Sequence, residues 1–598
     1  MINKKILEFL NDLDKKTIDK FSVRYEKNIS NSIKKIIKDS KITPSKIDIA
    51  EQTAFDYFPE NLKDASGWGT YYGPMYILPN DKGQMVEYPS IQNIDREIIL
   101  YWEKRAIESK NPLFYTRYAD LVIDFSNSII NKNSDIVFFQ KVIDGYVTIV
   151  DNELVSPIES LKKIKRALSL SIRINDTKRI QECANSLIRF EKKIAEDDKP
   201  GLWGNSLRLL ILDNGEKVNL SEKQISSIVQ DIEKILERLS NDTWGTKSAV
   251  DLLSKYYALK KDEENLMRVI SRYEEIINKD KRINASPLLI IHSLEQLKNL
   301  YTLYSNQFPK AEKARKKILR EIGNLNIDWE KSMNPITSSV TIKNEEIDNY
   351  LNSIFSNDDS IKLIDILGKI SFLFIPQEKN LKEQLIASNK RNPLLYIIST
   401  QIIADDGLPL ARLSPINDDY DSHYLRFARQ NIDIQSFFLS MVIKKFKELY
   451  SVETIENYFF SCLLFEEENK VYFKRALSAY WDNDFITSSH LFIPLIETSI
   501  RKLIRICGGN TVRPNNIGGY DRLLLHHLFL QKDIFESIFN GISSNTLFYF
   551  KLVLTQKIGL NLRNDFAHGI GKKKFETTEV SDRLFHILIC LSLVRDNG

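Results

Sequence analysis

The sequence predicts a mainly α-helical protein. The 598 residues include only 21 glycines and 17 prolines, which favours long helices over turn-rich sheets. Long stretches repeat apolar residues at helical spacing, as Val250, Leu253 and Tyr257 do. Strand-like segments are confined to two small candidate β-hairpins. A hydrophobic content of 43% and a charged content of 27% are ordinary for a globular chain, and this length indicates several domains.

The first predicted domain covers residues 1–198. Its first 65 residues have the pattern of helices with Lys- and Asp-rich outer faces, and amphipathic helix returns over 91–130. Between these stretches glycines, prolines and aromatic residues replace the helical pattern. Asn80–Gly83 is a turn motif there and predicts a small hairpin. Asp197–Gly201 breaks the helical pattern again and sets the predicted boundary.

A helical, repeat-like region is predicted over residues 199–335. Helix pairs are expected in it over about 247–278 and 286–324, and a similar pair is expected over about 158–196, at the end of the first domain. Their roughly regular recurrence resembles tetratricopeptide-type repeats, although a plain helical bundle fits the same pattern. These residues contain no pattern typical of catalysis. We therefore expect the region to act as a scaffold or sensor, with a regulatory protein as a possible partner.

The third predicted domain, residues 336–470, is a middle α domain with one small hairpin. Tyr396–Ile403 has the residue types of a strand, Asp405–Gly407 is a turn motif, and Leu408–Leu413 is the expected returning strand. An acidic stretch follows, formed by Asp418, Asp419, Asp421 and His423. Its spacing is less regular than that of a hard-cation loop, so we interpret it as a solvated acidic loop.

The last predicted domain covers residues 471–598 and contains four helices. They are expected at about 470–484, 487–507, 521–556 with interruptions, and 561–569 leading into 577–595. From residue 485 onward the chain has fourteen Lys/Arg and nine Asp/Glu, while the net charge of the whole chain is only +4. A basic bias suits a polyanionic partner. A solvated surface with a few extra lysines explains the same count.

Polar side chains of the types that take part in catalysis are concentrated in Leu560–Gly569. On a helix, Asn564 and His568 share a face because they lie four residues apart, and the long Arg563 side chain reaches the same cleft. Asn561 is the expected N-cap. A cation, a positive helix end and an imidazole at one place suit a phosphate group that must also exchange a proton.

The alternative interpretation of this stretch is structural. In it, His568 is a core histidine that bonds to Asn564 or Glu497, and Arg563 pairs with Asp565. The bare pattern of an arginine followed by a histidine does not decide between the two, because the chain contains it twice. In the second case, Arg522 to His526, the intervening residues are leucines. We interpret that copy as a buried helix edge.

The order Arg563-Asn564-x-x-x-His568-Gly569 resembles the motif of the HEPN superfamily. Together with the upstream helix that contains His490–Glu497, the segment 480–598 resembles domain-of-unknown-function family 4209. The resemblance implies a C-terminal HEPN-like four-helix bundle with metal-independent endoribonuclease activity. It also implies a homodimer in which two motifs face one cleft, and a role in prokaryotic antiviral defence or toxin-like growth arrest.

RNA cleavage through the 2′-hydroxyl gives roles to the motif residues. His568 is the expected acid or base, Arg563 is expected to stabilise the phosphate, and Asn564 completes the catalytic group. The expected supporting residues are Glu497, His490, Arg501 and Asp565, although Glu497 suits an internal salt bridge equally well. The expected RNA-binding residues are Lys572, Lys573 and Lys574, a run that is otherwise typical of a solvated turn. We expect no metal and no cofactor.

The motif contains one histidine, whereas acid and base catalysis together need two proton-transfer groups. We therefore expect the homodimer to form through the C-terminal domain. The alternative function is a non-catalytic scaffold that binds RNA or a protein partner. The cysteines Cys183, Cys462, Cys507 and Cys590 are scattered, and apolar runs are too short for a signal peptide or a membrane span. These features favour a cytoplasmic protein without membrane contact.

Overall fold

A computed structural model describes residues 2–15, 25–40, 43–59, 67–79, 85–239, 242–283, 286–324, 341–355, 362–404, 409–531, 534 and 543–594. Helices dominate these residues, and the strands among them form two-stranded sheets, which confirms the predicted mainly α class. The chain forms two compact units, Met1–Arg320 and Glu321–Gly598. The finer division into four domains stays a prediction.

Unit 1 begins with helices around a small β region. The helices are α1 (Lys4–Lys15), α2 (Tyr25–Ser40), α3 (Lys46–Ala54), α4 (Arg96–Glu108), α5 (Pro112–Ile130) and α6 (Ile136–Asp151). Strand β1 (Phe58–Pro59) pairs with β2 (Tyr72–Gly73), and β3 (Tyr76–Pro79) pairs antiparallel with β4 (Met85–Tyr88). The second pair is the predicted hairpin, and its turn at Asn80–Gly83 lies outside the described residues.

Buried carboxylates hold this part of unit 1 together. Glu51 accepts hydrogen bonds from the Tyr118 hydroxyl at 2.6 Å and from Arg105 Nε at 2.8 Å. Asp120 accepts from Arg166 Nη2 at 2.8 Å and from the Tyr146 hydroxyl at 2.9 Å. Because every partner donates to a buried charge, these networks offset the loss of hydration and fix the helix positions.

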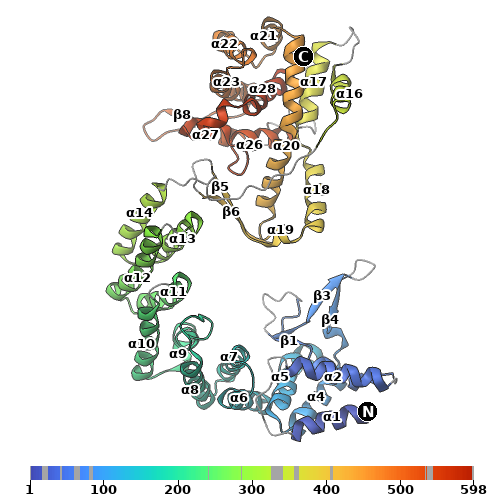
Figure 1. Cartoon of the computed structure of the whole chain (residues 1–598), viewed down its shortest axis with the longest axis vertical. Coiled ribbons are helices and arrows are strands. Elements are labelled where there is room, and N and C mark those ends of the chain that lie inside the picture. The colour runs from blue at the N-terminus through green and yellow to red at the C-terminus, as the bar shows by residue number, and fades with distance from the viewer. Residues whose placement is uncertain are drawn as a thin grey trace. The chain divides into compact units, whose positions relative to one another are not determined.

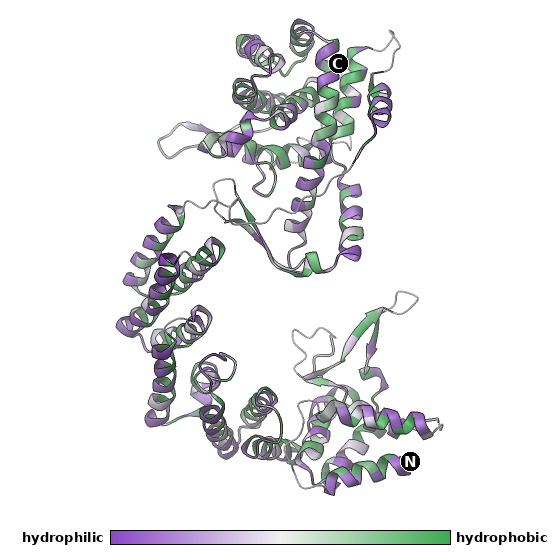
Figure 2. Cartoon of the chain, in the orientation of Figure 1, coloured by the Kyte–Doolittle hydropathy of each residue, from purple (hydrophilic) through white to green (hydrophobic). Residues whose placement is uncertain are grey.

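The rest of unit 1 is a succession of helices in which most neighbours along the chain contact each other (Figure 1). They are α7 (Pro157–Arg173), α8 (Thr177–Ile194), a π-helical turn (Leu207–Leu212), α9 (Gly215–Val218), α10 (Glu222–Arg238), α11 (Thr243–Leu259), α12 (Glu263–Arg282), α13 (Pro287–Tyr304) and α14 (Pro309–Gly323). The predicted helix pairs are present. Figure 2 shows polar and apolar colours mixed along most of these helices, as amphipathic helices require.

Unit 2 is built around one buried helix. Its helices are α16 (Asn344–Ile354), α17 (Leu363–Phe374), α18 (Glu378–Arg391), α19 (Leu394–Ile397), α20 (Tyr420–Leu449), α21 (Val452–Phe460), α22 (Lys470–Trp481), α23 (Phe485–Ile506), α24 (Leu525–Leu528), α26 (Ser543–Leu554), α27 (Leu562–His568) and α28 (Thr578–Ser592). Every residue of α28 from Val580 to Ser592 is buried, and α17, α20 and α23 pack against it. In Figure 2, α17 is largely green, in keeping with its burial against α28.

Three of the expected elements in unit 2 differ from the structure. The predicted strand from Tyr396 begins only at Thr400, because the preceding residues form α19. It is β5 (Thr400–Ile403), which pairs antiparallel with β6 (Pro409–Leu413). The predicted turn Asp405–Gly407 lies outside the described residues. The acidic stretch that follows β6 is only partly solvated, because His423 is fully buried and bonds through Nε2 to the Ser414 carbonyl at 2.7 Å.

The predicted third helix of the C-terminal bundle, 521–556, is also wrong at its start. Strand β7 (Val512–Pro514) pairs with β8 (Tyr520–Arg522) in an exposed hairpin, and the short helix α24 follows. Gly518, at φ +84°, occupies the turn. Arg522 is exposed on β8 and is not at a buried helix edge. All residues of both strands are exposed, so the hairpin carries no apolar alternation by which the sequence could indicate it.

The described helices include none that is both long enough and apolar enough to cross a membrane. The four cysteines are free thiols.

Candidate functional site

The motif helix α27 is short and has defined ends. Leu562 at its start is fully buried and fixes the helix to the core of unit 2. Gly569, at φ +66°, ends it: its N–H bonds to the Phe566 carbonyl at 3.1 Å, and the Ile570 N–H bonds to the Asp565 carbonyl at 2.9 Å. This is a Schellman-type end, which favours glycine at the left-handed position. His568 is therefore the last helical residue, at the edge of the unit.

Asn561 precedes the helix as expected, but the predicted N-cap interaction is wrong. The residue is left-handed, at φ +55°, and its side chain makes no capping hydrogen bond. Its Nδ2 donates instead to Asp565 Oδ1 at 2.7 Å, and its Oδ1 accepts from Asn564 Nδ2 at 2.9 Å. Asn564 also donates to the Thr555 carbonyl at 3.3 Å. These bonds tie the first turn of α27 to the end of α26.

The turn between α26 and α27 is closely packed. A Cβ at Gly559 would lie 2.0 Å from the Leu552 carbonyl oxygen, so only glycine fits here without displacement. The Gly559 carbonyl accepts a hydrogen bond from Arg429 Nη1 at 2.6 Å, and the Leu560 N–H donates to the Leu552 carbonyl at 2.8 Å. Helix α20 is thus fastened to the turn that presents the motif.

The motif lines a cleft of 1480 Å³ within unit 2. Its walls come from the β5–β6 hairpin, α20, α24, the turn before α27, α27 itself and the start of α28. The cleft brings together the predicted residues Arg563, Asn564, Asp565, His568 and Lys574. His568 is exposed here, so the alternative that made it a core histidine is wrong.

Glu497 of α23 joins two arginines beneath this cleft. Its Oε2 accepts from Arg563 Nε at 3.0 Å, and its Oε1 accepts from Arg501 Nη2 at 2.8 Å. The same Arg501 nitrogen also donates to the Leu523 carbonyl at 2.9 Å. The structural alternative predicted that Arg563 pairs with Asp565, and this is wrong, because Arg563 pairs with Glu497. The Glu497 carboxylate holds the motif arginine and, through Arg501, the base of the β7–β8 hairpin.

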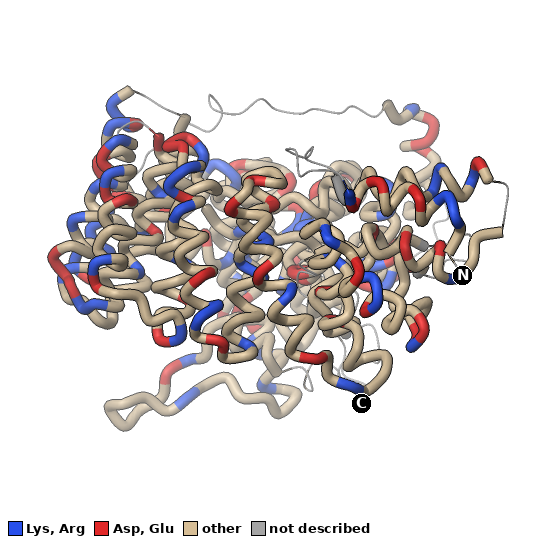
Figure 3. The backbone as a smooth tube through the Cα atoms, turned by 90° about the horizontal axis from the view of Figure 1, so that it is seen from below, with Lys and Arg blue, Asp and Glu red and all other residues tan. Residues whose placement is uncertain are grey.

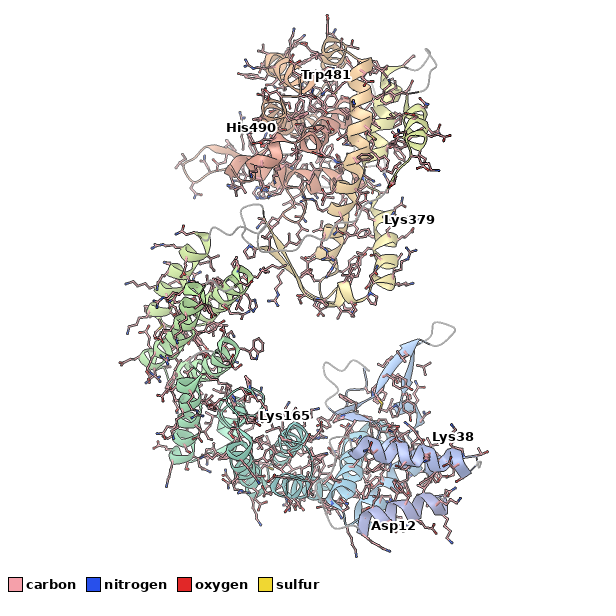
Figure 4. All side chains as sticks on the ribbon, viewed as in Figure 1. Asp12, Lys38, Lys165, Lys379, Trp481 and His490 are labelled. Atoms are coloured by element: carbon pink, nitrogen blue, oxygen red, sulfur yellow. The ribbon has the colours of Figure 1, made fainter. Side chains whose placement is uncertain are left out.

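Of the other residues expected to support catalysis or to bind RNA, some lie in the cleft and others lie outside it. Asp565 pairs with Lys574, whose ammonium group also donates to the Leu560 carbonyl at 3.3 Å. Lys573 is exposed, and the side chain of Lys572 is outside the described part of the structure. His490, labelled in Figure 4, is exposed on α23 and is not among the residues that line the cleft. Its ring packs edge-on against Phe566, at a centroid distance of 5.2 Å.

Sequence reasoning placed His526 at a buried helix edge, but His526 is exposed and lines the same cleft from α24. Its ring lies against that of His527, with centroids 3.9 Å apart. Adjacent residues of a regular helix point in different directions, but these two rings lie in contact. Burial lowers the pKa of His526, and the neighbouring His527 and Arg563 lower it further. The pattern that could have found it is the second arginine–histidine match, which starts at Arg522.

The charge of the cleft is predominantly positive. Among the described residues that line it, six are Lys or Arg: Arg426, Arg429, Lys557, Arg563, Lys574 and Arg583. Three are acidic, and two of these already pair with lining cations, Asp433 with Arg429 and Asp565 with Lys574. This excess is local, because Figure 3 shows Lys/Arg and Asp/Glu interspersed along most helices of the chain.

Arg583 is an unusual member of this group because it is 1% exposed. Its Nη2 donates to the Ile432 carbonyl at 2.7 Å and its Nε to Ser436 Oγ at 3.3 Å. Its Nη1 is buried without a hydrogen-bond partner among the described residues. Arg583 therefore contributes positive charge to the wall of the cleft from a buried position.

No protein-family model, curated protein or solved structure matches this chain. The described residues contain no group of three or more His, Cys, Asp or Glu placed to hold a metal ion.

Proposed function

We propose that this protein is a metal-independent endoribonuclease of the HEPN type, with the cleft of unit 2 as its active site. The observation that supports it most is the composition of that one cleft. It contains the motif residues Arg563 and His568, the second imidazole of His526, and twice as many cations as carboxylates. Imidazoles exchange protons near neutral pH, and arginines stabilise phosphate charge.

In the proposed reaction, the 2′-hydroxyl of RNA attacks the adjacent phosphorus. One imidazole accepts the 2′-hydroxyl proton and another protonates the leaving 5′-oxygen. Arg563 donates to the non-bridging oxygens as negative charge develops on them, with its Nε held by Glu497. Each proton transfer contributes about 10²–10⁴-fold to the rate. The products end in a 2′,3′-cyclic phosphate and a 5′-hydroxyl.

The resemblance to the HEPN superfamily adds biological context to the proposal. It favours a role in prokaryotic antiviral defence or toxin-like growth arrest in the cytoplasm. The helices of unit 1 then act as a sensor or scaffold for a regulatory protein. A homodimer through the C-terminal domain is one arrangement that supplies a second imidazole; His526 of the same chain is another.

The first test compares the full-length wild type with single alanine variants on a labelled RNA. Replacing Arg563 or His568 by alanine should each reduce cleavage at least 10²-fold without unfolding unit 2. Replacing Asn564 should have a smaller effect if its amide only fixes the first turn of α27. Normal cleavage by the His568→Ala variant would reject the proposal. RNA binding without cleavage by the wild type would favour the alternative scaffold function.

The second test concerns the chemistry. Cleavage should persist in EDTA, should spare DNA, which lacks the 2′-hydroxyl, and should leave a 2′,3′-cyclic phosphate. It should weaken steeply with added salt, because the cations of the cleft displace counterions from the RNA backbone. A requirement for Mg²⁺, or products that end in a 3′-hydroxyl, would contradict the mechanism.

A further inference from the structure

His526 lies in the motif cleft although it is 42 positions before His568 in the sequence. It is exposed on α24, a four-residue helix that follows the β7–β8 hairpin. Leu525 and Leu528 of the same helix are buried, at 1% and 0% exposure, which fixes α24 on the core and directs the imidazole of His526 to the cleft side. The cleft therefore contains two exposed imidazoles from one chain.

A continuous set of contacts joins the two sides of the site. Arg563 of α27 bonds to Glu497, Glu497 bonds to Arg501, and Arg501 bonds to the carbonyl of Leu523, three residues before His526. These three bonds measure 3.0, 2.8 and 2.9 Å, in that order. Behind His526 lies the half-buried ring of His527. The position of His526 relative to the motif is thus set by side chains of the site itself.

We propose that His526 is the second proton-transfer residue, acting as the base while His568 acts as the acid, so that one chain carries a complete active site. This inference rests on the proposed ribonuclease function and deepens it. It replaces the partner's histidine by a residue of the same chain, and dimerisation is then not needed for the chemical step.

The reaction balances with these two residues. His526 accepts the proton of the 2′-hydroxyl, and the 2′-oxygen forms a bond to phosphorus. The bond between phosphorus and the 5′-oxygen breaks, and His568 gives its proton to that oxygen. His526 ends protonated and His568 neutral, and exchange with solvent resets both for the next turnover. Charge on the phosphoryl oxygens is stabilised by Arg563 throughout.

The electrostatic surroundings of His526 agree with the role of a base. The charged or titratable groups that face the cleft are Arg426, Arg429 and Asp433 on α20, Lys557 before α27, Arg563, Asp565 and His568 on α27, Lys574, and Glu579 and Arg583 on α28. Burial lowers the pKa of His526, and the neighbouring His527 and Arg563 lower it further. A lowered pKa keeps the imidazole neutral at pH 7, as a base must be, and its protonation should abolish cleavage only at acidic pH.

The test uses the full chain, with His526→Ala and His526→Gln, and with His292→Ala as the matched control, because His292 is an exposed histidine of unit 1. Both His526 variants should cleave RNA at least 10²-fold more slowly while retaining the thermal unfolding midpoint of the wild type. The control should cleave normally. Full activity of both His526 variants, with His568→Ala inactive, would overturn this inference and leave the ribonuclease proposal standing.

A substrate with a 5′-thio leaving group separates acid from base, because a thiolate leaves without protonation. It should restore cleavage to His568→Ala but not to His526→Ala; the reverse pattern would overturn the assignment. Mixing the two inactive variants should restore nothing if each chain carries its own site, whereas recovery on mixing would show that the residues act across chains. No cleavage of any RNA by the wild type would reject both proposals.

Discussion

Glu497→Ala should loosen the motif helix by an amount that the structure allows us to specify. The variant removes the acceptor of Arg563 Nε and of Arg501 Nη2, at 3.0 and 2.8 Å. Exposed ion pairs contribute about 0–1 kcal/mol, whereas breaking a buried pair costs about 3–5 kcal/mol. The side chains of Arg501, Arg563 and Glu497 are 13%, 20% and 21% exposed. We therefore expect an intermediate loss, roughly 2 kcal/mol.

Hydrogen exchange followed by mass spectrometry measures this locally, without assuming that the whole chain unfolds in one step. Peptides from α27 and from the base of the β7–β8 hairpin should lose protection about 30-fold, the ratio that corresponds to roughly 2 kcal/mol. Cleavage should fall about 10-fold because Arg563 is no longer held. Glu497→Gln keeps one acceptor oxygen, so its loss of protection and its loss of cleavage should lie between those of the wild type and of Glu497→Ala. Glu383→Ala, at an exposed position of α18, is the control. Unchanged protection and unchanged cleavage in Glu497→Ala would refute the positioning role.

Other predictions concern packing and pH. Gly559→Ala places a methyl group against the Leu552 carbonyl and should destabilise unit 2 by about 1–3 kcal/mol in denaturant unfolding, whereas Gly569→Ala, with open space around it, should cost about 1–2 kcal/mol from backbone strain alone. Burial lowers the pKa of His586 to about 3, so its neutral form belongs to the folded state. Unit 2 should therefore lose stability as the pH falls from about 6.5 towards 3, by up to about 1.4 kcal/mol per unit, and His586→Gln should reduce that slope. Burial raises the pKa of Asp582, so Asp582 makes stability rise as the pH falls, in the wild type and in His586→Gln alike. An equal slope of stability against pH in the two proteins would therefore contradict the role given to His586.

The helical elements could be predicted because their pattern is local. Each amphipathic helix repeats apolar residues every three or four positions, whatever it packs against. This is why the helix pairs of unit 1 and the long helix α23 were recognisable from the sequence. The exposed β7–β8 hairpin has no such pattern, and the 521–556 prediction failed at that point.

The motif could also be predicted, because Arg563, Asn564 and His568 lie within one short helix. The other residues of the cleft, which come from distant parts of the chain, could not be predicted in the same way. Helix spacing places Asn564 and His568 on one face. Glu497, 66 positions earlier, was expected as a supporting residue, but only the packing of α23 beside α27 shows that its carboxylate binds both Arg563 and Arg501. The partners of Asp565 and Asn561 were likewise decided by the turn before α27 and by Lys574.

The sequence by itself thus determined the fold class, the helices and one wall of the cleft, because these depend on residues close together in the chain. The tertiary structure decided the other walls, the buried position of Arg583 and the place of His526. These depend on contacts between segments brought together only when α20, α23 and α28 pack. Packing follows from burial of apolar surface, which is not directional and leaves no local pattern in the sequence.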